Sequence, residues 1–328
     1  MKHLGISLLV LGSLTACGEK SDDKNSESGT TITAGSGPIS VAALAKPSDL
    51  GTLSRAEVIL AMESNRADFL ATEIEEPEAE EPVEEEGDVD CAAALSTVQV
   101  VAEGDTMSVD INLDMTECLK KAWSEAGEGV TASVTKAVMS FYIRQTCVGG
   151  DLSSFNGKML DEVGNPPECD NNKVLMNMTS EMVASISGNG QSMDINSNST
   201  NVFGTDANEP CLMTKTADGY AQDGCVEIFK SVGPEGNGDN EYTKYTHNSL
   251  KWVASPNNTW YTSGSIAVDM NDWAGAVTFR GADINPLYTM EYGTEKINGT
   301  LTVPSGLYFK NSLQRAVKRS LPDLRKMR

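Results

Sequence analysis

Ser133 and Lys136 have the spacing of a catalytic serine and its lysine base, Ser-x-x-Lys. That chemistry requires the amine to lie beside the hydroxyl, as it does when the two residues are one turn apart on a helix. The surrounding residues favour a strand instead, because they are β-branched: Val130, Thr131, Val134, Thr135 and Val138. In a strand, residues three positions apart point to opposite faces. The pattern therefore does not predict a serine nucleophile.

His247 is the single histidine that follows Cys17, and no zinc-binding or nucleophile motif surrounds it. We expect it on a strand, as a surface or hydrogen-bonded residue. Carboxylates are plentiful, and two of them about 5–10 Å apart in a cleft would suit glycan hydrolysis. Sequence does not reveal such a pair, so an envelope hydrolase that acts on a glycan stays an alternative. We predict no catalytic residue, no metal site and no cofactor.

Cys17 ends a segment with the features of an export signal. The start is short and basic, residues 4–14 are almost wholly apolar, and Leu14-Thr15-Ala16-Cys17 closes the segment. These last four residues resemble the lipobox of bacterial lipoproteins, and the resemblance covers residues 1–17 only. It implies a signal peptide over 1–16, acyl chains on the Cys17 thiol and attachment to a membrane. Gly18 stands where an aspartate favours the inner membrane in Gram-negative lipoproteins, so we expect the outer membrane.

The remaining cysteines predict disulfides. Seven cysteines less Cys17 leave six, an even number in a chain expected to be exported. Six cysteines allow many pairings, and we favour neighbours because short loops cost least entropy to close. The predicted pairs are Cys91–Cys118, Cys147–Cys169 and Cys211–Cys225, and the stretches inside the last two look like loops. Zinc is not predicted, because there is no Cys-x-x-Cys and a single candidate histidine.

The charge distribution argues against nucleic acid as a partner. The net charge is −22 at pH 7, whereas phosphates require a basic surface. Residues 73–90 hold eleven acids and no base, and we interpret them as a solvated Pro/Glu linker. Residues 310–328 hold seven bases and one acid, and we interpret them as a basic C-terminal tail. We expect this tail to contact the protein's own acidic surface, with an anionic membrane as the alternative.

Two further segments are expected before the acidic linker. Residues 17–50 are rich in Ser, Gly, Thr and Asp and predict a lipidated flexible tether. Residues 51–72 predict an amphipathic helix that begins at a capping box, Ser54-Arg55-Ala56-Glu57. The residues expected near its buried face are Leu53, Ala56, Leu60, Ala67 and Leu70.

Residues 91–309 predict a disulfide-braced β domain. Alternation from Val109 to Met115 is typical of a strand with one buried face. Further strands are expected over 130–144, 174–187, 192–203, 225–232, 241–254, 259–270, 274–280, 287–292 and 296–303, with a helix over 116–125. We therefore predict a mainly β fold: an antiparallel sandwich, barrel or curved open sheet of about ten strands. One short N-terminal helix would lie on the disordered tether.

Aromatic residues gather near the C-terminal end of this domain. Three of the four tryptophans and six of the eight tyrosines fall between residues 242 and 308. They suit either cross-strand packing or contact with a ligand, and the candidates for ligand contact are Trp252, Trp260, Tyr261 and Trp273. The function expected from all this is a lipid-anchored cell-envelope protein with a non-catalytic binding or structural role. Its partner would be a lipid, a glycan or an envelope protein; a surface spacer or adhesin is a further alternative, and the oligomeric state stays open.

Overall fold

The computed structural model describes residues 30–39, 44–71, 97–124, 130–163, 169–188, 191–204, 209–232, 240–253 and 260–302. Four sequence predictions lie outside these residues: the acylated Cys17, Cys91, the acidic linker 73–90 and the basic tail 310–328. The described residues form one antiparallel sheet of 14 strands with two α-helices. The prediction of a mainly β fold is thus confirmed.

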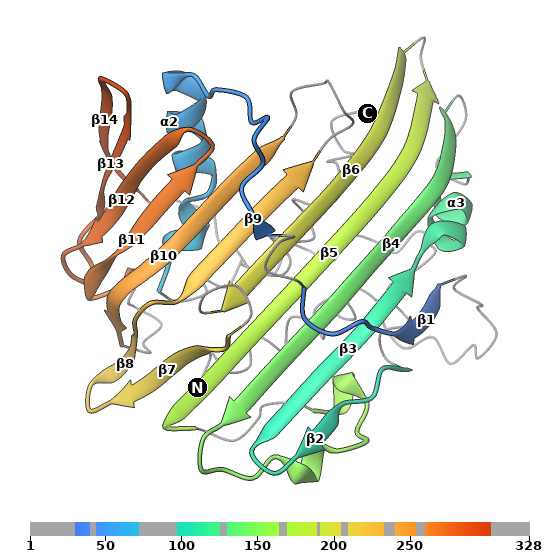
Figure 1. Cartoon of the computed structure of the whole chain (residues 1–328), viewed down its shortest axis with the longest axis horizontal. Helices are drawn as coiled ribbons and strands as arrows, with labels where there is room; N and C mark the ends of the chain where they lie inside the picture. The colour runs from blue at the N-terminus through green and yellow to red at the C-terminus, as the bar shows by residue number, and fades with distance from the viewer. Residues whose placement is uncertain are drawn as a thin grey trace, which may run out of the picture.

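The strands follow one another across the sheet nearly in chain order, so most neighbours are hairpins (Figure 1). The order is β1-β3-β4-β5-β6-β9-β10-β11-β12-β13-β14, and β2 pairs with β3. The hairpin of β7 and β8 bridges β5 to β10. Among the described strands, the two ends of this order do not pair with each other, and the long strands β4 to β6 curve (Figure 1). Of the three architectures left open, the chain has the open curved sheet.

The strand bounds match most of the expected ranges to within a few residues. The strands are β1 Thr31–Ala34, β2 Val101–Glu103, β3 Thr106–Asp114, β4 Val130–Cys147, β5 Asn171–Gly188, β6 Gln191–Gly204, β7 Cys211–Thr216, β8 Gly219–Gln222, β9 Val226–Val232, β10 Glu241–Trp252, β11 Ser263–Met270, β12 Trp273–Phe279, β13 Leu287–Tyr292 and β14 Glu295–Thr300. In β3, every second residue from Met107 to Leu113 is buried, as the alternation predicts. Side chains of the longer strands also alternate between the two sides of the sheet, so each face carries its own set of residues.

One face, here the helix face, packs against helices α2 (Arg55–Ser64) and α3 (Thr116–Ser124). Segments 97–103 and 148–163 cover the same face over β3 to β5. The opposite face is crossed by residues 35–39 and 44–50, here the strap, which runs from β1 toward α2 (Figure 1). On that face Leu44 packs on an apolar cluster from β6, β9 and β10: Val202, Val226, Ile228 and Tyr242.

Helix α2 begins where predicted but buries a different face. Ser54 and Glu57 form the predicted capping box. Val58 and Met62 are fully buried against the sheet, whereas Leu60, expected inside, is 63% exposed. Residues 58–62 are all apolar, so helical periodicity alone does not distinguish one side from another. A short 3-10 helix, Arg66–Phe69, follows in place of continued α-helix.

Two segments expected to lack regular structure pair with the sheet. Within the predicted tether, β1 pairs with β3 over residues 31–34, and Leu44 in the strap is buried. Within the stretch bounded by Cys211 and Cys225, β7 and β8 form a hairpin. In both cases a short segment satisfies the backbone groups of neighbouring strands, a long-range gain that local composition does not reveal.

Candidate functional site

Uncharged polar side chains gather at one end of the helix face, where β7 and β8 lie between β5 and β10. We call these residues the polar band: Gln145 of β4, Asn172 of β5, Gln222 of β8 and His247 of β10. The strand register places the first three on one face, since Asn172 lies opposite Cys147 and Met213, and Met213 lies opposite Gln222. Gln145 shares the face of Cys147, two residues further along β4.

The two amides on β4 and β5 are buried without hydrogen bonds. Gln145 is 0% and Asn172 is 1% exposed. The amide nitrogen and oxygen of both side chains find no hydrogen-bond partner among the described residues. Leaving a buried polar group unpaired costs about 1–3 kcal/mol. The two residues therefore place four buried polar atoms without a described partner close together.

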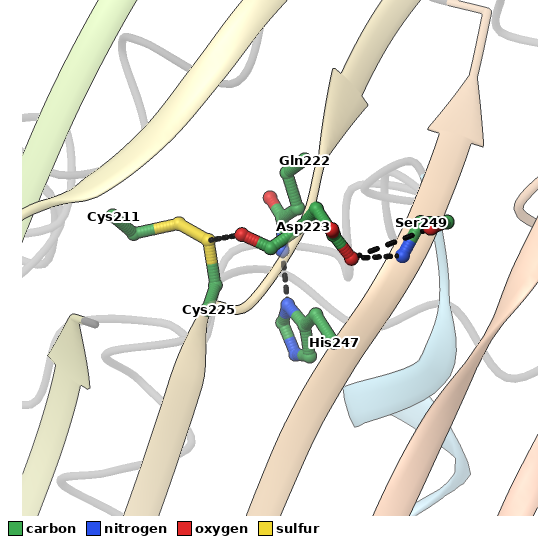
Figure 2. Close-up of a disulfide and its surroundings, with 6 residues drawn as sticks. All are labelled: Cys211, Gln222, Asp223, Cys225, His247 and Ser249. Carbon is green, nitrogen blue, oxygen red and sulfur yellow. Dashed lines mark hydrogen bonds between the residues drawn. A yellow bond between two sulfur atoms is a disulfide. The ribbon is translucent and has the colours of Figure 1, made fainter. Parts of the chain in front are cut away.

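The other two members of the polar band are partners. The Gln222 amide Nε2 donates to His247 Nδ1, as Figure 2 shows. Burial lowers the pKa of His247 to about 4, so the imidazole is neutral at pH 7 and its Nδ1 is free to accept. The Phe203 ring lies 6.1 Å from the imidazole, centroid to centroid. The sequence-based expectation of a hydrogen-bonded histidine on a strand matches this arrangement, although the side chain is buried.

Disulfides border the polar band. Cys147 pairs with Cys169 and Cys211 pairs with Cys225, with Cα atoms 5.4 and 5.2 Å apart, and both are predicted pairs. Cys118 on α3 is also disulfide-bonded; its predicted partner Cys91 lies outside the described residues, so that pairing stays a prediction.

The turn after β8 is held in place beside the Cys211–Cys225 disulfide (Figure 2). The Asp223 carboxylate accepts from the backbone N–H of Ser249 at 2.6 Å. Ser249 has a φ of 49° at a bulge in β10, so this hydrogen bond supports an unfavourable backbone conformation. His247 is consequently held between a cross-linked hairpin and a fixed bulge.

Away from the polar band, the buried residues of the helix face are mostly apolar and rich in methionine, with Ser180, Ser199, Asn201 and Thr243 as the polar exceptions. Seven of the chain's 14 methionines are buried on it: Met107, Met139, Met176, Met178, Met182, Met270 and Met290. Methionine side chains are flexible and polarizable, so they adapt to ligands of different shape. Met213, between Asn172 and Gln222, is only partly buried.

The aromatic residues singled out from sequence belong to the core. Trp252, Trp260 and Trp273 are buried, and Tyr261 is partly buried against the same cluster. The indole N–H of Trp273 donates to the Leu53 carbonyl at 2.9 Å, which ties α2 to the sheet. Trp252 stacks on Tyr220 with ring centroids 5.6 Å apart. These tryptophans serve packing and do not offer the exposed platform on which a sugar would stack.

Ser133 and Lys136 lie on one face of β4, contrary to the sequence prediction. A bulge between Val134 and Lys136 places them opposite Ser185 and Val183, which are two residues apart on β5. Both side chains are exposed. The lysine ammonium donates to the Glu181 carboxylate at 2.6 Å, so a surface ion pair occupies it. Ser133 and Lys136 therefore do not form a nucleophile and base, although they share a face.

Sequence reasoning missed Gln145 and Asn172, although a signal was present. The alternation of buried residues from Met139 to Ile143 continues to position 145, so a glutamine there points inward.

Comparison of the chain with protein-family models, curated proteins and solved structures gives no match. No helix among the described residues is both long and apolar enough to cross a membrane.

Proposed function

We propose that this chain is an exported, lipid-anchored cell-envelope protein that binds a largely apolar ligand on the helix face of its sheet. Acyl chains on Cys17 would attach it to the outer membrane. The lipobox resemblance supports the anchor, and the disulfides support export, because such bonds persist in oxidising compartments. Binding, rather than catalysis, is the proposed role.

The observation that carries the ligand proposal is the methionine-rich helix face with its few buried polar groups. Sites for small molecules are mostly apolar and use a small number of polar side chains to orient the ligand. Every buried polar side chain among the described residues is an amide, a hydroxyl or the neutral His247. Such an interior suits a neutral or lipid-like ligand better than an ionic one, because an unpaired buried charge is costly.

The covering segments favour a site that opens. The helix face is covered by separate pieces, α2, α3 and segments 97–103 and 148–163, rather than by a second sheet. Segments 97–103 and 148–163 form one piece, since the Val100 N–H donates to the Lys158 carbonyl and the Gly157 N–H to the Val100 carbonyl, and this piece packs on a different part of the face from α2 and α3. Segment 148–163 carries two short 3-10 helices and is attached at both ends to the Cys147–Cys169 disulfide. A ligand would replace contacts between such a cover and the sheet.

Native mass spectrometry of the mature protein, purified from its own envelope, tests the ligand proposal. We expect an additional apolar molecule that organic solvent extracts without unfolding the sheet, and we expect the stripped protein to rebind hexadecane. A protein that carries only its own acyl chains and does not take up hexadecane would contradict the proposal.

Fractionation of a Cys17→Ser variant tests the anchor separately. The variant should be soluble or remain an uncleaved precursor, and it should not incorporate labelled palmitate. Continued labelling together with partition into detergent would show that another residue is acylated.

A further inference from the structure

Gln145 and Asn172 together offer two N–H₂ donors and two carbonyl acceptors, none of them paired among the described residues. Their nearest strand partners do not supply polar side chains. Met107 and Val174 lie opposite Gln145, while Cys147 and Met213 lie opposite Asn172. Backbone groups of these central strands are already used in the sheet. The missing partner is therefore water, a bound molecule or a part of the chain outside the described residues.

The charged side chains near Gln145 and Asn172 limit which bound molecule fits there. The charged neighbours along the same strands, Arg144 and Lys173, alternate with Gln145 and Asn172 and so project from the opposite face. No charged side chain among the described residues is buried beside the two amides. A carboxylate or phosphate here would lack a counter-ion. Primary amides instead both donate and accept, which matches an ester, an amide or a hydroxyl group.

An apolar track leads away from the two amides on the helix face. Along β4 and β5 it consists of Ile143, Met176, Phe141, Met178 and Met139, all buried. The seven residues from Asn172 to Met178 span about 20 Å of strand, a length suited to an extended acyl chain. The partly buried Met213 lies opposite Asn172 on β7.

We propose that Gln145 and Asn172 bind the uncharged carbonyl end of an acyl ester or acyl amide, whose chain lies along the methionine track. This inference rests on the proposed function and adds the chemical class of the ligand and its orientation. The polar end lies beneath segment 148–163 and near Met213, and the chain points toward the middle of the sheet. The Cys147–Cys169 disulfide keeps the covering segment in place over the carbonyl.

The test uses the mature protein, stripped of bound molecules, with methyl palmitate, palmitate and hexadecane as probes. The double variant Gln145→Leu/Asn172→Leu keeps the apolar track and removes the amides. We expect it to bind methyl palmitate about tenfold more weakly, as the loss of two hydrogen bonds implies, and hexadecane unchanged. Its ligand-free melting temperature should rise, because two unpaired buried groups are gone. Asn198→Leu, at an exposed position of β6, is the control and should change neither affinity.

The outcomes separate this inference from the proposed function. If the wild type binds neither hexadecane nor methyl palmitate, the proposed function fails. If it binds both and the double variant binds both equally well, the function stands and the amides hold water only. Tighter binding of palmitate than of its methyl ester would contradict an uncharged site. Should the double variant not fold, nuclear magnetic resonance of isotope-labelled wild type replaces it: the Asn172 side-chain N–H₂ signals should shift with the ester and not with hexadecane, and unshifted signals would overturn the inference.

Discussion

At the scale of single residues, His247 ties the stability of the fold to pH. Its pKa is lowered from 6.5 to about 4 in the folded chain, because burial opposes the charged imidazolium. As pH falls from 6.5 to 4, the unfolded chain binds a proton that the folded chain does not. The folded state should therefore lose about 3 kcal/mol across that window from this residue alone. Well above pH 6.5 the imidazole is neutral in both the folded and the unfolded chain, so His247 adds no further pH dependence to the free energy of unfolding.

Chemical denaturation at a series of pH values checks this expectation. A His247→Gln variant has no titrating group at the position, so the difference between wild type and variant isolates the histidine from the carboxylates. The difference should change steeply between pH 6.5 and 4 and stay flat above. A difference that does not vary with pH would mean that His247 has the same pKa in the folded and unfolded chains, as a solvated imidazole would.

At the scale of elements, helix α2 depends on Met62 and not on Leu60. Met62 is fully buried against the sheet, whereas Leu60 is 63% exposed. Met62→Ala should lower the free energy of unfolding by about 2–5 kcal/mol, since it leaves a cavity. Leu60→Ala, the matched change on the same helix, should stay within about 0.5 kcal/mol of wild type. Urea titration of the two variants measures both values, and a larger loss for Leu60→Ala would show that the helix packs on its other side.

The hairpin of β7 and β8 depends on its disulfide. Cys211 and Cys225 close a loop with a sequence separation of 14, which the chain-entropy model values at about 3 kcal/mol. A Cys211→Ser/Cys225→Ser variant should lose about that much stability. Its amide hydrogens should exchange faster in β7 and β8 than in β4 and β5, because the hairpin is short and partly exposed. Peptide mapping without reduction that finds free thiols at these positions would contradict the pairing.

Elements were predictable where local sequence and final packing agree. Alternation identified β3, and turn residues identified the hairpin of β5 and β6. The buried side of α2 was not predictable, because the sheet surface around Trp273 selects it. The bulge that turns Ser133 and Lys136 to one face, the edge strand β1 and the unpaired amides likewise depend on register between distant segments. The sequence does not show which residue of one strand lies opposite which residue of the next.

At the scale of the whole molecule, the proposed anchor and the proposed ligand site would act on opposite faces of one sheet. The strap continues from the N-terminal segment that would carry the lipid, and it is fixed by hydrogen bonds such as Gly37 N–H to the Asp110 carboxylate at 2.9 Å. Lys46 of the strap also pairs with Asp269 at 2.8 Å. Tension on the tether would thus act on β1, β3 and the strap.

Photo-crosslinking tests the central claim, that the helix face binds an apolar ligand, most directly. The mature protein would be irradiated with a long-chain ester that carries a photoreactive group near the end of its chain, and the labelled peptides identified by mass spectrometry. The account predicts label on residues 139–147 and 172–182 of β4 and β5, removed by excess methyl palmitate. Label confined to the strap and other exposed segments, or label that methyl palmitate does not displace, would contradict it.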